Sequence, residues 1–298
     1  TENGKFAPTW VWAQGLAYRG ERKAEEILGN ISLDWKHRWG ASNLSATILA
    51  EYQKKKMAAF WTQVKGLTNN YFGYNNLGAA SDRPYGGTGS SYADPSLASF
   101  MGTLTYTLLD RYTLNLTTRA DGSSMVGKDH TWGFFPSISA TWDMKKEGFL
   151  RDNKAISLLN LRTGYGQSGN LGGISSYLTL KQYIPVGLIS YNGTPTVTLG
   201  TLRNSNPDLR WETRSTFNIG ADLGFFKNRL LLTAEYYYSK TTDMLYEYDV
   251  PVPTFAFDKL LANIGSMSNS GFELGIGIVP ISKKDMELNV NINMAWQK

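Results

Sequence analysis

The chain has no cysteine among its 298 residues, which excludes a disulfide scaffold and any metal site built on thiolates. It also lacks a run of about 18 apolar residues, which a membrane-spanning helix would need. Prolines number only 10 against 30 glycines, few for the turns of a soluble sheet protein of this length. The net charge of +5 is spread along the chain, and its one dense basic run, residues 54–56, is expected to end a strand. We therefore expect no nucleic-acid partner.

The sequence also gives little support for a catalytic function. His37 and His130 are the only histidines, and the sequence contains neither a Gly-x-Ser-x-Gly elbow nor a Walker loop. Asp143, Asp222 and Glu273 occupy polar positions of expected strands, where solvated carboxylates are expected rather than the acid pair of a glycosidase. No acidic loop has the ligand density of a calcium site. We expect no enzymatic activity, no bound metal and no cofactor.

What the chain does have is strict alternation, most plainly near its end. Between residues 286 and 297, Met, Leu, Val, Ile, Met and Trp occupy the even positions, and the odd positions are polar except for one alanine. In an extended chain successive side chains point to opposite faces, so this segment is a strand with one apolar face. We expect the apolar set to face lipid and the asparagines to face a lumen. These sets are Leu288, Val290, Ile292, Met294 and Trp296 on one side, and Asn289, Asn291 and Asn293 on the other.

The same pattern recurs along the chain and predicts about twelve or thirteen strands. Clear copies lie at residues 31–36, 44–52, 103–108, 112–119, 134–143, 216–223 and 272–278, and weaker ones at 10–18, 158–166, 175–183, 196–203 and 229–241.

The expected connections also alternate in length. Short links are expected at residues 38–42, 109–111, 225–229 and 282–285, with a somewhat longer one at 145–157; long links are expected at 57–98, 121–131, 167–174 and 241–260. Short periplasmic turns and long extracellular loops are typical of outer-membrane barrels. A soluble β-sandwich or jelly roll would alternate too, but its strands are usually shorter.

Five segments carry a more specific signal: DRY…RADGSS at residues 110–124, GFFPSISATW at 133–142, LRTGYGQSGN at 161–170, NPDLRWET at 206–213 and NIG…NSGFE at 263–273. In order and spacing they resemble the SusC/RagA family of TonB-dependent outer-membrane transporters, over residues 28–298. Each motif also has a structural interpretation. Gly164, Gly166 and Gly169 relieve crowding where a strand bends, and Asp121 begins a turn-forming sequence. We interpret the motifs as structural rather than as a binding site.

The resemblance implies an all-β fold, an antiparallel transmembrane β-barrel in the outer membrane, of the 22-stranded, plugged size class. No segment resembles the family's plug, and no terminal aromatic closes the last strand. We therefore expect residues 1–298 to be part of a barrel domain whose plug and remaining strands belong to the same polypeptide.

The same resemblance implies import of an oligosaccharide or oligopeptide. It also implies energy supplied by the TonB–ExbB–ExbD complex through the plug, and a SusD-like surface lipoprotein as a cap. A siderophore or cobalamin receptor and a non-transporting adhesin or structural barrel remain alternatives, and the residues do not identify the substrate. Aromatic and amide side chains in residues 57–98 are the candidate substrate contacts, because aromatic faces stack on sugars or peptide side chains while amides bond to polar groups. Packing within the loop or against the lipoprotein is the simpler interpretation of the same residues. The candidates are Trp61, Tyr71, Tyr74, Asn75, Asn76, Tyr85 and Tyr92.

Overall fold

The computed structural model describes residues 15–67, 71, 73–84 and 87–298. Within them the chain is almost entirely β-structure, with one four-residue α-helix, α1 (Gly148–Arg151), and short 3-10 turns. The strands are β1 (Leu16–Trp39), β2 (Ser42–Leu67), β3 (Ala80–Asp82), β4 (Thr88–Ala93), β5 (Ser96–Leu108), β6 (Tyr112–Ser123), β7 (Trp132–Asp143), β8 (Ile156–Asn170), β9 (Tyr183–Tyr191), β10 (Thr194–Thr201), β11 (Glu212–Phe225), β12 (Leu230–Asp249), β13 (Lys259–Lys283) and β14 (Met286–Gln297).

One large sheet contains all of these strands except β9 and β10. Its order is β1-β2-β5-β6-β7-β8-β11-β12-β13-β14, with β3 and β4 paired to β2, and β1 does not pair with β14. The neighbours from β6 to β14 are all antiparallel. The predicted antiparallel all-β fold is therefore confirmed, as a sheet that does not close within this chain. The chain divides into two compact units: the first holds residues up to Gly29 together with Tyr52–Leu97, and the second holds Asn30–Glu51 and Ala98–Lys298.

Cross-strand register carries the alternation from strand to strand in the second unit. Leu114 pairs with Ala140, which pairs with Thr163, and the row continues through Ile219 to Tyr236. Because adjacent residues point to opposite faces, the next row lies on the other side of the sheet. That row is Thr113, Thr141, Arg162, Gly220, Glu235 and Glu273. The sheet thus has one mainly apolar and one polar face.

The last strand follows the predicted parity. Val290 pairs with Ile278 and Met294 with Leu274 on the apolar face, whereas Asn291 lies opposite Gly277 on the polar face. The ring of Trp296 lies 6.0 Å from that of Phe272. Most of these apolar side chains are exposed within the chain, as a face covered by lipid requires.

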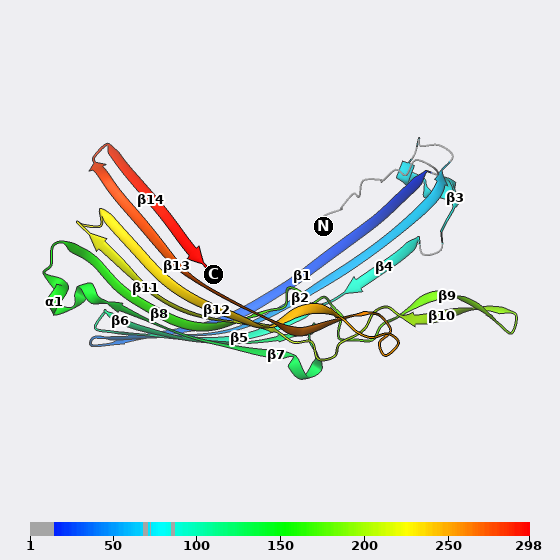
Figure 1. Cartoon of the computed structure of the whole chain (residues 1–298), viewed down its shortest axis with the longest axis horizontal. Helices are drawn as coiled ribbons and strands as arrows, with labels where there is room; N and C mark the ends of the chain where they lie inside the picture. Colours follow the sequence, from blue (N-terminus) through cyan, green and yellow to red (C-terminus); the bar gives the residue numbers. More distant parts are fainter. Residues whose placement is uncertain (1–14, 68–70, 72, 85–86) are drawn as a thin grey trace. The chain divides into compact units, whose positions relative to one another are not determined.

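The four predicted short links and the longer link before β8 are confirmed by the ends of the strands that flank them. Figure 1 shows the β11–β12 and β13–β14 turns and α1 at one end of the strands of the second unit, with the β9–β10 hairpin at the other end. Leu109 and Asp110 in one turn and Phe226, Lys227 and Asn228 in another all have positive φ, which tight turns between strands require. No helix in the described ranges is long and apolar enough to cross a membrane.

Strands continue into the predicted long loops, so those at residues 57–98, 121–131 and 241–260 are shorter than expected. The link after β8 starts later than expected and runs over residues 171–182, which makes it longer than the predicted 167–174. β2 runs to Leu67, and β4 pairs with it over Met57–Thr62, so much of residues 57–98 is a hairpin rather than a loop. Similarly, β8 runs to Asn170, while β12 reaches Asp249 and β13 begins at Lys259. A strand can extend beyond the membrane wherever a neighbour satisfies its backbone groups.

The basic run at residues 54–56 therefore lies within β2 and does not end it. Lys54 forms an ion pair with Asp94 at 3.6 Å, so a charged run is accommodated inside a strand.

The predicted wall strands at residues 175–183 and 196–203 are wrong. Residues 175–182 form no strand, and β9 and β10 form a separate two-stranded sheet. The turn between them is Asn192-Gly193, with φ of 50° and 77°. An Asn-Gly turn of this kind pairs two strands that are adjacent in the sequence. The alternating pattern therefore predicted a strand here but not which strand it pairs with. The weak pattern at 158–166 lies in β8 and that at 229–241 almost entirely in β12; the one at 10–18 falls largely outside the described residues, and β1 begins at Leu16.

Candidate functional site

A charged network runs across the polar face of the second unit. The guanidinium of Arg162 on β8 lies 2.5 Å from Glu235 Oε2 and 3.3 Å from Asp222 Oδ2. Thr233 Oγ1 donates to Asp222 Oδ1 at 3.1 Å, which holds the second carboxylate. The three charged side chains are between 22% and 34% exposed, so water still reaches them. Glu273 lies directly opposite Glu235 on the neighbouring strand. This face carries the ionised groups that a water-filled interior tolerates and a lipid-facing surface does not.

A second network lies nearer the long loops. Arg119 Nε donates to both carboxylate oxygens of Asp121 at 2.8 Å, and its NH2 donates to Ser99 Oγ at 2.9 Å. The carboxylate of Glu51 lies 3.9 Å from the same guanidinium. Asp121 and Ser99 are almost fully buried, so the arginine fixes the junction of β2, β5 and β6.

The connections that follow β6 and β8 and precede β11 meet in a small apolar core. Val126, Ile174 and Leu209 are each no more than 5% exposed and pack together. Gly127 N–H donates to Leu209 O at 2.7 Å. A Cβ at Gly127 would lie 1.9 Å from Pro207 O, so only glycine fits where the two segments touch. We call this core and the side chains bonded around it the loop floor.

Asn263 connects the loop floor to β13. Its Oδ1 accepts from Arg210 N at 3.0 Å, and its Nδ2 donates to Arg210 O at 2.8 Å and Asp243 O at 2.7 Å. The guanidinium of Arg210 donates in turn to Asp243 Oδ1 through two nitrogens. Asn206 Nδ2 adds a bond to Leu261 O at 2.9 Å. The side chains of Asn206, Arg210 and Asn263 therefore bond to neighbouring main-chain atoms and to the carboxylate of Asp243.

Trp211 and Glu212 complete the floor. Trp211 Nε1 donates to Thr131 O at 3.3 Å, and its ring meets that of Phe135 edge-on at 5.6 Å. Glu212 accepts from Asn170 Nδ2 at 2.7 Å and from the main-chain N–H of Leu245 at 2.8 Å. A Cβ at Gly169 would lie 2.1 Å from the Phe135 ring, so any larger residue at this position of the motif would clash with Phe135. These contacts agree with the structural interpretation of the motifs. The predicted turn at Asp121 is wrong, however, because Asp121 and Gly122 lie in β6 and pair with Gly133 and Trp132 of β7.

At the opposite end of the strands, Glu147 gathers the residues of the DRY motif. Its Oε1 accepts from Tyr112 Oη at 2.5 Å and Trp142 Nε1 at 3.0 Å, and its Oε2 lies 2.7 Å from Arg111 NH1. The hydrogen bonds from Tyr112 and Trp142, with the charge of Arg111, hold the pKa of the Glu147 carboxyl below its usual range. Lys146 Nζ donates to Asp110 O at 2.6 Å and so ties the β7–β8 connection to the β5–β6 turn.

The predicted substrate contacts do not assemble into one site in the structure. Trp61 lies on β2 opposite Gly89, and Tyr92 lies on β4 opposite Ala58, so their side chains leave opposite faces of the β2–β4 pair. Tyr74 and Asn75 belong to a 3-10 turn (Gly73–Asn75), and Asn76 precedes the next one (Leu77–Ala79). Tyr71 is 87% exposed. Tyr85 lies outside the described residues.

A cavity of about 180 Å³ in the first unit includes none of the seven predicted residues. Its lining is Thr62, Gln63, Val64, Leu77, Gly78, Arg83, Pro84 and Thr88. The seven residues stay a prediction.

His37 stacks between Trp35 and Trp39, at ring distances of 5.8 Å and 5.4 Å, and within the described ranges no group of three or more His, Cys, Asp or Glu could hold a metal. Sequence reasoning named Asp222 and Glu273 only as solvated acids and missed Arg162. The sequence signal that could have identified Arg162 is its position among the residues of β8 that point to the polar face.

The sequence model of the family described as "TonB dependent receptor-like, beta-barrel" matches residues 6–298. The chain belongs to this family. The SusC/RagA resemblance is confirmed as well, since SusC of Bacteroides thetaiotaomicron is 37% identical over 210 residues, which are 67% of this chain and 20% of SusC. TonB-dependent receptor P26 of Formosa agariphila is 36% identical over 227 residues, 76% of this chain and 22% of P26.

The RagAB peptide transporter shares the fold, with a TM-score of 0.80 and 24% identity over 95% of this chain and 31% of that one. The chain thus spans roughly a fifth to a third of the lengths of these relatives. It is an outer-membrane β-barrel segment.

Proposed function

We propose that this chain is part of the barrel wall of an active importer of oligosaccharides or oligopeptides. The observation that carries the proposal is the two-faced sheet, in which the Arg162–Asp222–Glu235 network lies on one face and a mainly apolar surface on the other. Arg and Lys on the lipid face of a barrel cost about 2–4 kcal/mol at the bilayer midplane. A network of this kind is therefore expected to line a wet interior, through which a polar solute can pass.

The arrangement of the loops supports a large polar solute. Turns lie at one end of the strands, where we place the periplasm, and the loop floor holds the bases of the long connections at the other. Trp61, Tyr74 and their predicted companions in residues 57–98 are our candidates for substrate contacts. A SusD-like lipoprotein as cap and a TonB–ExbB–ExbD complex as energy source belong to the same proposal, which rests on family membership.

Uptake by the full-length receptor in cells tests the proposal. Labelled oligopeptides and oligosaccharides should accumulate only when TonB is present, and Trp61→Ala should reduce accumulation. Phe226→Ala is the control, because Phe226 is an exposed aromatic residue in the β11–β12 turn and is not among the candidate contacts. Accumulation without TonB would indicate a passive pore and contradict active import. Binding of a siderophore or cobalamin in place of both substrates would support the alternative class of receptor.

A further inference from the structure

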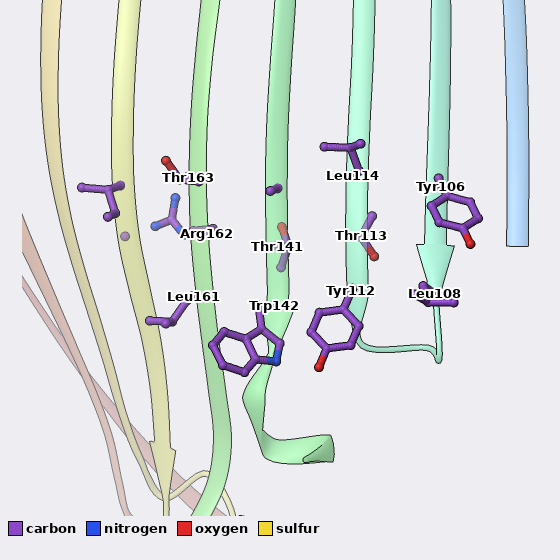
Figure 2. Close-up of a pocket in the computed structure, with 13 residues that line it drawn as sticks. Tyr106, Leu108, Tyr112, Thr113, Leu114, Thr141, Trp142, Leu161, Arg162 and Thr163 are labelled. Atoms are coloured by element: carbon purple, nitrogen blue, oxygen red, sulfur yellow. The ribbon is translucent and has the colours of Figure 1, made fainter. Parts of the chain in front are cut away.

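We propose that the apolar face carries a binding groove for one acyl chain of a phospholipid in the periplasmic leaflet. A cavity of about 460 Å³ opens on this face, with an apolar lining drawn from β5, β6, β7, β8 and β11. This volume falls in the range of about 300–1,000 Å³ that small-molecule sites occupy. Figure 2 shows Tyr112 and Trp142 side by side at one end of it and Leu114 farther along.

The groove exists because small residues are neighbours in the register. Ala140 pairs with Leu114 on one side and with Thr163 on the other, and Thr163 pairs with Ile219. Ala140 and Thr163 are thus flanked along their row by two larger apolar residues. The row toward the turns is larger still, with Tyr112, Trp142 and Leu161 in sequence. A depression bounded by large side chains results, and no neighbouring element of the second unit fills it.

The aromatic rim of the groove is held in place. Tyr112 Oη and Trp142 Nε1 both donate to the same oxygen of Glu147, and their rings lie 6.1 Å apart. Tyr106 at the other side forms a 3.0 Å hydrogen bond with Ser42 Oγ. A site whose walls are fixed before binding loses little side-chain freedom when it is occupied.

This face is surrounded by membrane hydrocarbon, so a lipid acyl chain is the molecule available to fill the groove. Leu114 is 37% and Ile219 52% exposed within the chain, and lipid must cover what remains. The connection at residues 144–155 suits a phosphate headgroup at the end of the groove, because it carries four basic and two acidic residues. Arg151 and Lys154 have no acidic partner within 4.0 Å in the described part of the chain. Phe149 beside them is 71% exposed, as interfacial aromatic anchors are.

The test is the lipid that stays with the full-length receptor after detergent extraction and washing, measured by native mass spectrometry. We expect wild type to retain phospholipid and Ala140→Leu to retain roughly tenfold less or lower still, because the added side chain takes the place of about three methylenes of the ligand. Ala234→Leu is the matched control, since Ala234 lies on the same face next to Ala221 and Leu274 but outside the groove. Equal retention in both variants, or none in wild type, would overturn the proposal.

A second measurement does not depend on the folding of a filled variant. A benzophenone amino acid replaces Ile219 in the groove or Ile276 on the same face outside it, and light is applied after the detergent wash. A phospholipid adduct at position 219 alone supports the site; a lipid A or protein adduct there overturns it. The choice of leaflet rests on the proposed orientation of the turns. Retention is measured without transport, so failure of the import proposal would leave it unchanged.

Discussion

Arginine at position 290 should destabilise the protein far more than arginine at position 291. Val290 lies in the middle of the apolar face of β14, with Leu288 on one side and Ile292 on the other, and it pairs with Ile278. Arginine there must reach through hydrocarbon to find water. Asn291, one residue along, faces Gly277, which has no side chain. Arginine at 291 would extend over the polar face.

The magnitudes follow from the position in the bilayer. An arginine on the lipid face costs about 2–4 kcal/mol near the midplane. At about 1.4 kcal/mol per factor of ten, Val290→Arg should lower the folding equilibrium constant roughly 30-fold to 700-fold. Asn291→Arg should lower it by less than about tenfold, because solvent-facing substitutions usually change stability by under 1 kcal/mol.

Urea titration of the full-length receptor folded into lipid vesicles measures both values, with folded and unfolded forms separated by electrophoresis. Val290→Thr is a useful companion, since it retains the branched shape without the charge. Equal losses for the two arginine variants, or a larger loss for Asn291→Arg, would show that the assignment of faces is wrong.

Three further outcomes are expected. An epitope tag inserted beside Gly87 should be labelled on intact cells and one at Asn228 should not; the reverse would invert the orientation. Asn263→Ala should lower the free energy of unfolding by about 1–3 kcal/mol, because it leaves partners of three hydrogen bonds unpaired, and a loss no greater than that of exposed Asn289→Ala would contradict its place in the loop floor. The lowered pKa of Glu147 means that its ionised form adds stability above the usual carboxyl pKa and loses it as pH falls through the lowered value. The Tm difference between wild type and Glu147→Gln should therefore be full above about pH 4.5 and shrink below it, and a difference that grows in acid would refute this explanation.

Alternation predicted the two faces and the short turns, because both depend on local residue order. Met294 and Asn291 could be assigned to faces without knowing their neighbours. Pairing partners are a different matter: Val197 and Leu188 alternate like wall residues, yet they pair with each other in a separate hairpin. Nothing in a two-residue period distinguishes these cases.

The candidate site shows the same limit. The motifs at residues 161–170 and 206–213 were visible in the sequence, but their convergence on the loop floor joins segments about 80 residues apart. The predicted contacts in residues 57–98 assumed a loop, whereas β2 and β4 pair through much of that segment and separate Trp61 from Tyr92. The aromatic and amide content of residues 57–98 suggested a binding loop. That content does not show that β2 and β4 pair to form a hairpin.

The bonds of the loop floor fall largely on main-chain atoms. Asn263, Asn206 and Trp211 donate to carbonyl oxygens, and Glu212 accepts one backbone amide. Such partners are present whatever side chain the accepting residue bears. The segment between Ile174 and Leu209, which includes the β9–β10 hairpin, therefore leaves the floor and returns to it at fixed points. We therefore expect the segment between these two points to tolerate changes of sequence and length, because the contacts that hold its ends do not depend on the side chains within it.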